Sequence, residues 1–176
     1  ACIHSCLLDV DGDGDLDLFQ SSGGKLAGSD DELWRSYLLL DAGTTYLDVT
    51  ATAGLGVLSG LETSNPSLLD LDNDGDLDLL IGFPLIVFMN SGHGVFEDVT
   101  ATSGLSGEVM QVLDAEGDGF LDVLTREEGA IKTTLWHNQG NDYHWLRVEL
   151  AGAESNRNGI GARLEVQAGS HAQVQQ

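Results

Sequence analysis

Three short acidic segments carry the residues best suited to chemistry. Each has carboxylates at its first, third, fifth and ninth positions, and the three sets are Asp9, Asp11, Asp13 and Asp17; Asp70, Asp72, Asp74 and Asp78; and Asp114, Glu116, Asp118 and Asp122. A hard divalent cation takes roughly six to eight oxygen ligands, which short carboxylates on a tightly turning loop supply. The spacing therefore predicts three cation-binding loops. Calcium is favoured over magnesium, which requires a stricter octahedron and keeps its waters.

The other loop positions fit the same prediction. The fourth and sixth positions hold only residue types that accept a positive φ, so each loop can curl round an ion: Gly12, Asn73 and Gly117 at the fourth, and Gly14, Gly75 and Gly119 at the sixth. The seventh position varies, which suits a backbone carbonyl ligand, and is occupied by Asp15, Asp76 and Phe120. The eighth position is always leucine (Leu16, Leu77, Leu121), which we expect to pack into a core beneath the ion.

An acidic, solvated run is the alternative interpretation of such segments. Apolar residues argue against it, because they bracket every copy, as Leu7–Leu8 and Leu18–Phe19 do around the first. The third copy departs from the other two in having Glu116, whose side chain is longer. We therefore expect about three Ca²⁺ ions, one for each loop.

Composition and charge limit the partners. The chain has 176 residues, 41% of them hydrophobic, and a formal net charge of −22 at pH 7. That charge disfavours nucleic acids and anionic membranes as partners, and no apolar run is long enough to predict a membrane span. Calcium loops of modest affinity fill only where calcium is about millimolar, which predicts an extracellular location, either secreted or at the cell surface.

The two cysteines leave their state open. Cys2 and Cys6 are too far apart on an extended strand to bond to each other without a turn between them. They are either small buried residues of a first strand or partners in a bridge, within the chain or to a second copy.

A second repeat accompanies the acidic loops. The segment Tyr46–Leu55 matches Phe96–Leu105, and each contains Asp-Val-Thr. Around the middle loop, apolar and β-branched runs predict the strands Ser67–Leu69, Leu77–Gly82, Leu85–Asn90 and Val95–Thr100. The polar, glycine-rich stretch Ser21–Trp34 is predicted to be a surface insertion. The fold class is therefore all-β, built from about three β-hairpin units in which each acidic loop joins two strands.

This pattern resembles the FG-GAP/VCBS repeat family, whose members include the β-propeller blades of integrin α-chains. The resemblance rests on the Asp-x-Asp-x-Asp-Gly-x-x-Asp loops and on the run Phe88–Thr100, and it covers residues 1–140. It implies blade-like sheets with calcium bound at the hairpin between two strands, at the loop positions given above.

The remaining residues, 141–176, resemble the start of an ASPIC/UnbV domain, through His144–Leu150 and Ser155–Arg163. We expect Trp145–Leu150 to form a strand, Asn156–Gly161 a turn, and Leu164–Val166 a second strand. Arg157 is either a ligand contact or a hairpin-tip residue that bonds local carbonyls.

Three units are too few for a closed propeller, which has at least about four blades. Open sheet edges invite pairing with another chain. We therefore expect a part of a longer propeller, a compact stack of hairpins capped by the tail, or a homo-oligomer whose edges close against copies of itself. Head-to-tail edge pairing that does not close would give a polymer in the form of a filament.

No motif for catalysis is present. The sequence has no nucleophile elbow, no zinc-protease motif and no phosphate loop. The five histidines have no metal-ligand spacing, and we expect His93 and His144 to be structural. We therefore predict a non-enzymatic protein. The favoured function is a calcium-binding extracellular structural or adhesion module; a module that binds a glycan or surface protein, and a non-catalytic part of a secreted enzyme, remain the alternatives.

Overall fold

The computed structural model describes residues 2–23, 37–61, 63–127, 129, 131–143, 146, 148–152, 159, 161–168 and 171–175. In these residues the chain is all-β, with antiparallel sheets and a single turn of 3-10 helix at Leu55–Leu58. None of the sheets closes into a barrel. The predicted fold class is confirmed.

Three sheets follow one another along the chain, and each has its strands in sequence order. The first contains β1 (Cys2–Leu8), β2 (Asp17–Gly23), β3 (Tyr37–Asp41) and β4 (Tyr46–Asp48). The second contains β5 (Ser64–Leu69), β6 (Asp78–Phe83), β7 (Ile86–Asn90) and β8 (Phe96–Asp98). The third contains β9 (Glu108–Leu113), β10 (Asp122–Arg126) and β11 (Thr133–Trp136), and a separate hairpin contains β12 (Leu164–Ala168) and β13 (His171–Gln175).

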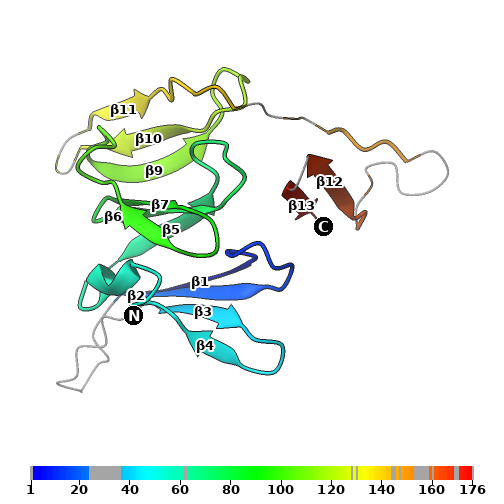
Figure 1. The fold of residues 1–176 in the computed structure, drawn as a ribbon. Helices are drawn as coiled ribbons and strands as arrows, with labels where there is room; N and C mark the ends of the chain where they lie inside the picture. Colours follow the sequence, from blue (N-terminus) through cyan, green and yellow to red (C-terminus); the bar gives the residue numbers. More distant parts are fainter. Residues whose placement is uncertain are drawn as a thin grey trace.

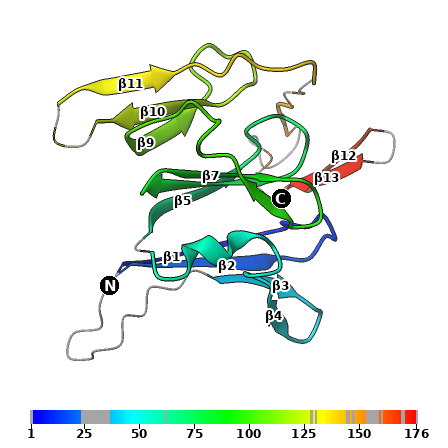
Figure 2. The same cartoon turned by 60° about the vertical axis from the view of Figure 1, so that its left-hand side comes forward.

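The first three sheets lie in layers in the order of the chain (Figures 1 and 2). The middle layer is buried on both faces, because a sheet packs against each of them. Successive side chains of β6 point to opposite sides, so this strand contributes to both cores. Leu79 belongs to the core shared with the first sheet and Leu80 to the core shared with the third, and both are fully buried. This explains why the sequence of the middle unit is almost continuously apolar.

The three sheets share one register. The cross-strand row Leu7, Leu18 and Leu39 of the first sheet corresponds to Leu68, Leu79 and Phe88 of the second and to Val112, Val123 and Trp136 of the third. The second and third rows pack into the cores between sheets. On the outer face of the first sheet, by contrast, Leu7 is 61% exposed.

The Asp-Val-Thr repeat stabilises the end of each four-stranded sheet. In the second sheet, Asp98 Oδ1 accepts a hydrogen bond from the Thr100 N–H at 2.9 Å, and the Thr100 hydroxyl oxygen accepts the Val87 N–H at 2.9 Å. Asp48, Thr50 and Leu38 make the same bonds in the first sheet. The threonine thereby satisfies a strand N–H that the short fourth strand does not reach.

The predicted strands around the middle loop are confirmed, with shifted ends. Three other predictions are wrong. Leu146 and 148–150 are not in a strand, since the described part of the chain offers them no pairing partner. Leu16 is 54% exposed rather than packed beneath the loop. Ser21 belongs to β2 and is fully buried, so the surface insertion does not begin there.

Several other predictions fall partly or wholly outside the described residues: 24–34 of the insertion, the side chain of Cys2, Trp145, and most of the turn at 156–161 with Arg157. Cys6 lies in β1 as a free, half-buried thiol. Strand β12 confirms the strand predicted at Leu164–Val166. The boundary between 1–140 and 141–176 stays a prediction.

Candidate metal loops

The three acidic segments are the hairpin loops that join β1 to β2, β5 to β6 and β9 to β10, as the sequence predicted. The first aspartate of each loop organises the turn by accepting backbone N–H groups. Asp9 Oδ1 accepts Gly12 N–H at 2.8 Å and Asp13 N–H at 3.1 Å, and its Oδ2 accepts Gly14 N–H at 3.0 Å. Asp70 and Asp114 accept the equivalent fifth- and sixth-position N–H groups of their own loops.

The fifth position repeats in the same way. The side chains of Asp13, Asp74 and Asp118 each accept the N–H of the residue two positions later, at 2.9 to 3.0 Å. These bonds hold the fifth carboxylate against its own backbone and fix the turn at the variable seventh position. The seventh-position residues Asp15, Asp76 and Phe120 therefore contribute their N–H to the turn whatever their side chain.

The ninth-position aspartates are buried beneath the loops. Asp17 and Asp122 are each 1% exposed and Asp78 is fully buried. In the middle loop, Asp78 Oδ2 accepts Leu71 N–H at 2.8 Å and its Oδ1 accepts Asn90 N–H at 2.8 Å. Asp17 and Asp122 bind the equivalent N–H groups at 2.9 to 3.0 Å. The ninth carboxylate thus ties the loop to the strand beside it.

Carboxylates converge in all three loops. Ligand atoms lie within 4.8 Å of one another in three groups: Asp9, Asp11 and Asp13; Asp70, Asp72 and Asp78; and Glu116, Asp122 and His137. Of the other predicted ligands, Asp17, Asp74, Asp114 and Asp118 lie on the same loops but outside these groups, as do the side chains of Asp15, Asp76 and Phe120. These clusters could hold a metal ion.

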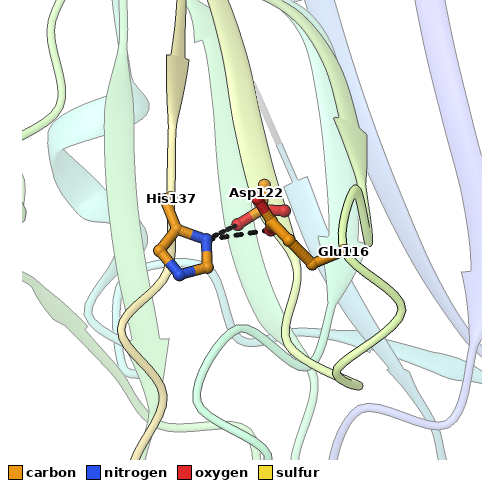
Figure 3. Close-up of side chains that lie close together, drawn as sticks. All are labelled: Glu116, Asp122 and His137. Carbon is orange, nitrogen blue, oxygen red and sulfur yellow. Dashed lines mark hydrogen bonds and ion pairs between the residues drawn. The ribbon is translucent and has the colours of Figure 1, made fainter.

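The third group contains a residue that the sequence analysis missed. His137 follows β11, and its Nδ1 lies 3.0 Å from Glu116 Oε2 and 3.2 Å from Asp122 Oδ1 (Figure 3). Alignment of the three units would have indicated it. His137 directly precedes Asn138, just as Met89 precedes Asn90, so it stands where the second unit has an apolar residue at the end of its third strand.

Crowding and burial disfavour negative charge in the first two loops. Burial is the main cause that raises the pKa of Asp11, Asp17, Asp70 and Asp72, and neighbouring aspartates add to the effect. The effect is largest at Asp78, where burial raises the pKa to about 7 despite the two N–H groups that the carboxylate accepts. Within the described residues, positive charges are not among the main causes of these pKa shifts.

The third loop has a different balance. Burial opposes ionisation of Asp122, but the N–H groups of Asn138 and Ala115 and the nearby His137 outweigh it and lower the pKa of Asp122. Desolvation works against the charged imidazole, yet the carboxylates of Glu116 and Asp122 raise the pKa of His137. A protonated His137 therefore supplies positive charge beside Glu116 and Asp122 in this loop.

Comparison with family models, with curated proteins and with solved structures found no match. Within the described residues, helices long and apolar enough to cross a membrane are absent.

Proposed function

We propose that the chain is a calcium-binding structural module of the extracellular, adhesion-associated kind, without catalytic activity, and that its three loops each take one divalent cation. The observation that carries this proposal is that ligand atoms converge at the acidic loop of three successive hairpins, through positions one, three and five in the first, one, three and nine in the second, and three and nine with His137 in the third. A single acidic cluster is common on protein surfaces, whereas three copies with one hydrogen-bonding pattern indicate a repeated site.

The donor set of the first two loops fits calcium. The grouped ligands there are all carboxylate oxygens, which hard cations prefer, and nitrogen or sulfur donors are absent from those two groups. Backbone N–H groups donate to both oxygens of Asp9 and of Asp70, but Asp9 Oδ2 accepts that of Gly14 and Asp70 Oδ2 that of Gly75, which leaves a lone pair on each of these two oxygens for a cation. The third group includes an imidazole nitrogen, so its cation must displace His137 from Glu116 and Asp122 or share them with it.

The bound ion would supply positive charge at the centre of each loop. The residues of the chain do the rest. The position-one aspartates shape the turns, the position-nine aspartates fasten the turns to the neighbouring strands, and the sheets then stack through their apolar faces. The module is therefore a stack of sheets whose loops are stable only when their charge is neutralised. The resemblance to FG-GAP/VCBS repeats belongs to this proposal and is supported by the same loops.

Thermal unfolding with and without calcium tests the proposal. Ligand that binds only the native state adds RT ln(1 + [L]/Kd), so about 10 mM calcium at weak extracellular sites contributes about 1.4–2.7 kcal/mol for each loop. For a chain of this size each kcal/mol moves Tm by about 2–4 °C. We therefore expect Tm to fall by about 8 °C or more when calcium is replaced by excess EDTA, and an unchanged Tm would contradict the proposal.

A matched pair of variants makes this test specific. Asp74→Asn removes one loop charge but keeps the oxygen that accepts the Asp76 N–H. It should therefore reduce the increase in Tm that calcium causes, while the Tm measured in EDTA stays unchanged or rises. Glu97→Gln removes the same charge from an exposed position in β8 and should leave both values unchanged.

We further propose that copies of the chain associate head to tail through the two outer sheet faces. Leu7 on the first sheet is 61% exposed and Leu135 on the third is 47% exposed. Leu135 and Leu124 form the row equivalent to Val87 and Leu80, which are buried between the second and third sheets. Each outer face therefore matches a face that already packs against a neighbouring sheet within the chain, and a second copy would supply that neighbour.

A further inference from the structure

A buried asparagine links the first two loops. Asn90, at the end of β7, is 4% exposed. Its backbone N–H donates to Asp78 Oδ1 in the loop of its own sheet at 2.8 Å, and its side-chain Nδ2 donates to the Val10 carbonyl at 3.0 Å. Val10 belongs to the loop of the first sheet, eighty residues away in the chain. One residue therefore contacts two candidate metal loops.

Asn138 repeats this arrangement at the next junction. Its backbone N–H donates to Asp122 Oδ1 at 2.9 Å in the third loop, and its Nδ2 donates to the Leu71 carbonyl at 2.9 Å in the middle loop. Two asparagines at equivalent places thus make equivalent bonds across the two boundaries between sheets.

The peptide groups that accept these bonds are themselves fixed by the buried aspartates. The Val10 N–H donates to Asp17 Oδ2 at 2.9 Å, and the Leu71 N–H donates to Asp78 Oδ2 at 2.8 Å. Because each of these residues has its N–H bound to its own loop and its carbonyl bound by the next sheet, the hydrogen bonds run without interruption from Asp17 through Asn90 and Asp78 to Asn138 and Asp122.

The first sheet shows that the amide is what crosses the boundary. Asp41 stands at its equivalent position, and the Asp41 N–H donates to Asp17 Oδ1 at 2.9 Å, as Asn90 does to Asp78. The Asp41 carboxylate accepts the Gly43 N–H, just as the side-chain oxygen of Asn90 accepts the Gly92 N–H. Unlike the asparagine side chain, the Asp41 carboxylate has no N–H to donate. A carboxylate can therefore occupy this position and keep the bonds to the ninth aspartate and to the following glycine. The amide Nδ2 of Asn90 adds a bond to the Leu77 carbonyl of its own loop at 3.2 Å and, across the boundary, the bond to Val10.

We propose that Asn90 and Asn138 are positioning residues that couple the three metal loops, so that calcium binding at one loop strengthens binding at the next. This inference rests on the proposed function, since it concerns the same three loops. An ion in the middle loop orders Asp78 and Leu71, and thereby holds Asn90 against Val10. The first loop then loses less conformational entropy when its own ion binds, so it binds calcium more tightly. By linkage, an ion in the first loop strengthens binding at the middle loop by the same factor.

Each loop offers its own reporter for a calcium titration of the full chain by NMR. Gly14, Gly75 and Gly119 donate their amide N–H to the first aspartate of their loops, so each amide signal should shift when its own loop is filled. The titration compares the unmodified chain with Asp74→Asn, which weakens only the middle loop directly. Coupling predicts that the calcium concentration at the midpoint of the Gly14 titration rises by about fivefold or more in this variant.

Variants at the two asparagines then locate the coupling. In an Asn90→Asp background, adding Asp74→Asn should no longer move the Gly14 midpoint. Asn138→Asp adds the same charge at the other junction and serves as the matched control, because the effect of Asp74→Asn on Gly14 should persist there. The first junction is the cleaner one to test, since Asn73 Nδ2 also bonds the Gly119 carbonyl at 3.0 Å across the second.

The outcomes separate the two proposals. Glycine amides that respond to calcium while the Gly14 midpoint stays unchanged in Asp74→Asn show independent loops, which overturns the coupling and leaves the proposed function standing. A shift that persists in the Asn90→Asp background overturns the role of Asn90. Amides that ignore calcium in every loop overturn the proposed function itself, and the coupling with it. If Asn90→Asp fails to fold, the Asp74→Asn comparison still decides whether the loops are coupled.

Discussion

Within each loop, the ninth aspartate differs from the other acids. The spacing pattern treats all the carboxylates as ligands, but Asp17, Asp78 and Asp122 are almost completely buried and join the loop to the neighbouring strand. In the first two loops the acids at positions three and five accept N–H groups of their own turn, whereas Glu116 at position three of the third loop pairs with His137. Burial explains why the largest rise in pKa occurs at Asp78, which lies in the middle sheet.

This charge balance predicts the pH dependence of the calcium-free protein. The folded-state pKa of Asp78 is about 7, so its carboxyl keeps a proton between about pH 4 and 7, where the unfolded chain has lost it. The stability of the calcium-free fold should therefore decrease as pH rises through this window. The raised pKa values of Asp11, Asp17, Asp70, Asp72 and His137 act in the same direction. The lowered pKa of Asp122 affects stability only below its ordinary value of 3.8, outside this window.

Unfolding in EDTA across this pH range measures the effect. We expect a lower Tm at pH 7.5 than at pH 5, and a calcium-induced increase in Tm that is larger at pH 7.5, because protons then compete less for the carboxylates. A calcium-free Tm that rises steadily from pH 5 to 7.5 would show that the loops tolerate their own charge.

At the scale of strands, the sequence predicted the middle unit well and the tail poorly. The strands around the middle loop are marked by apolar runs between turn residues, and both neighbouring sheets are present to bury them. The alternation at Leu146, Val148 and Leu150 is equally regular, yet these side chains are exposed outside any strand. An alternating pattern becomes a strand only where a partner supplies the ladder of hydrogen bonds.

The Asp-Val-Thr repeat gives a prediction at this scale. Thr100→Val keeps the shape of the side chain but leaves the N–H of Val87 without its acceptor in a buried strand. We expect a loss of about 1–3 kcal/mol in the free energy of unfolding, measured by urea denaturation with calcium present. Thr100→Ser keeps the hydroxyl and is the control. Equal stability of the valine and serine variants would show that this hydrogen bond contributes nothing.

At the scale of the whole molecule, the repeats made the succession of similar sheets predictable, whereas the contacts between sheets were not. Asn90 and Val10 lie eighty residues apart, and His137 reaches Glu116 and Asp122 only because β11 pairs with β10. Such contacts depend on the stacking order and the shared register. The type of each residue was visible in the sequence, but its partner was not.

The open outer faces predict association of the whole molecule. With calcium present, light scattering at increasing protein concentration should show a rising average mass. The exposed face with Leu7 on one copy can pack against the exposed face with Leu135 on the next copy. Leu135→Lys should reduce this rise without lowering Tm, since the side chain lies on the outer face. A constant monomer mass up to high concentration would contradict the proposed association.

The central claim is that divalent cations occupy the three acidic hairpin loops and neutralise their charge. A crystal structure of the protein grown in about 10 mM calcium, with anomalous data, tests it most directly, since weak extracellular sites are filled at that concentration. The account predicts an anomalous peak in each loop, with oxygen ligands at about 2.3–2.6 Å from Asp9, Asp11 and Asp13, from Asp70, Asp72 and Asp78, and from the acids of the third loop. Loops that hold only water under these conditions would contradict it.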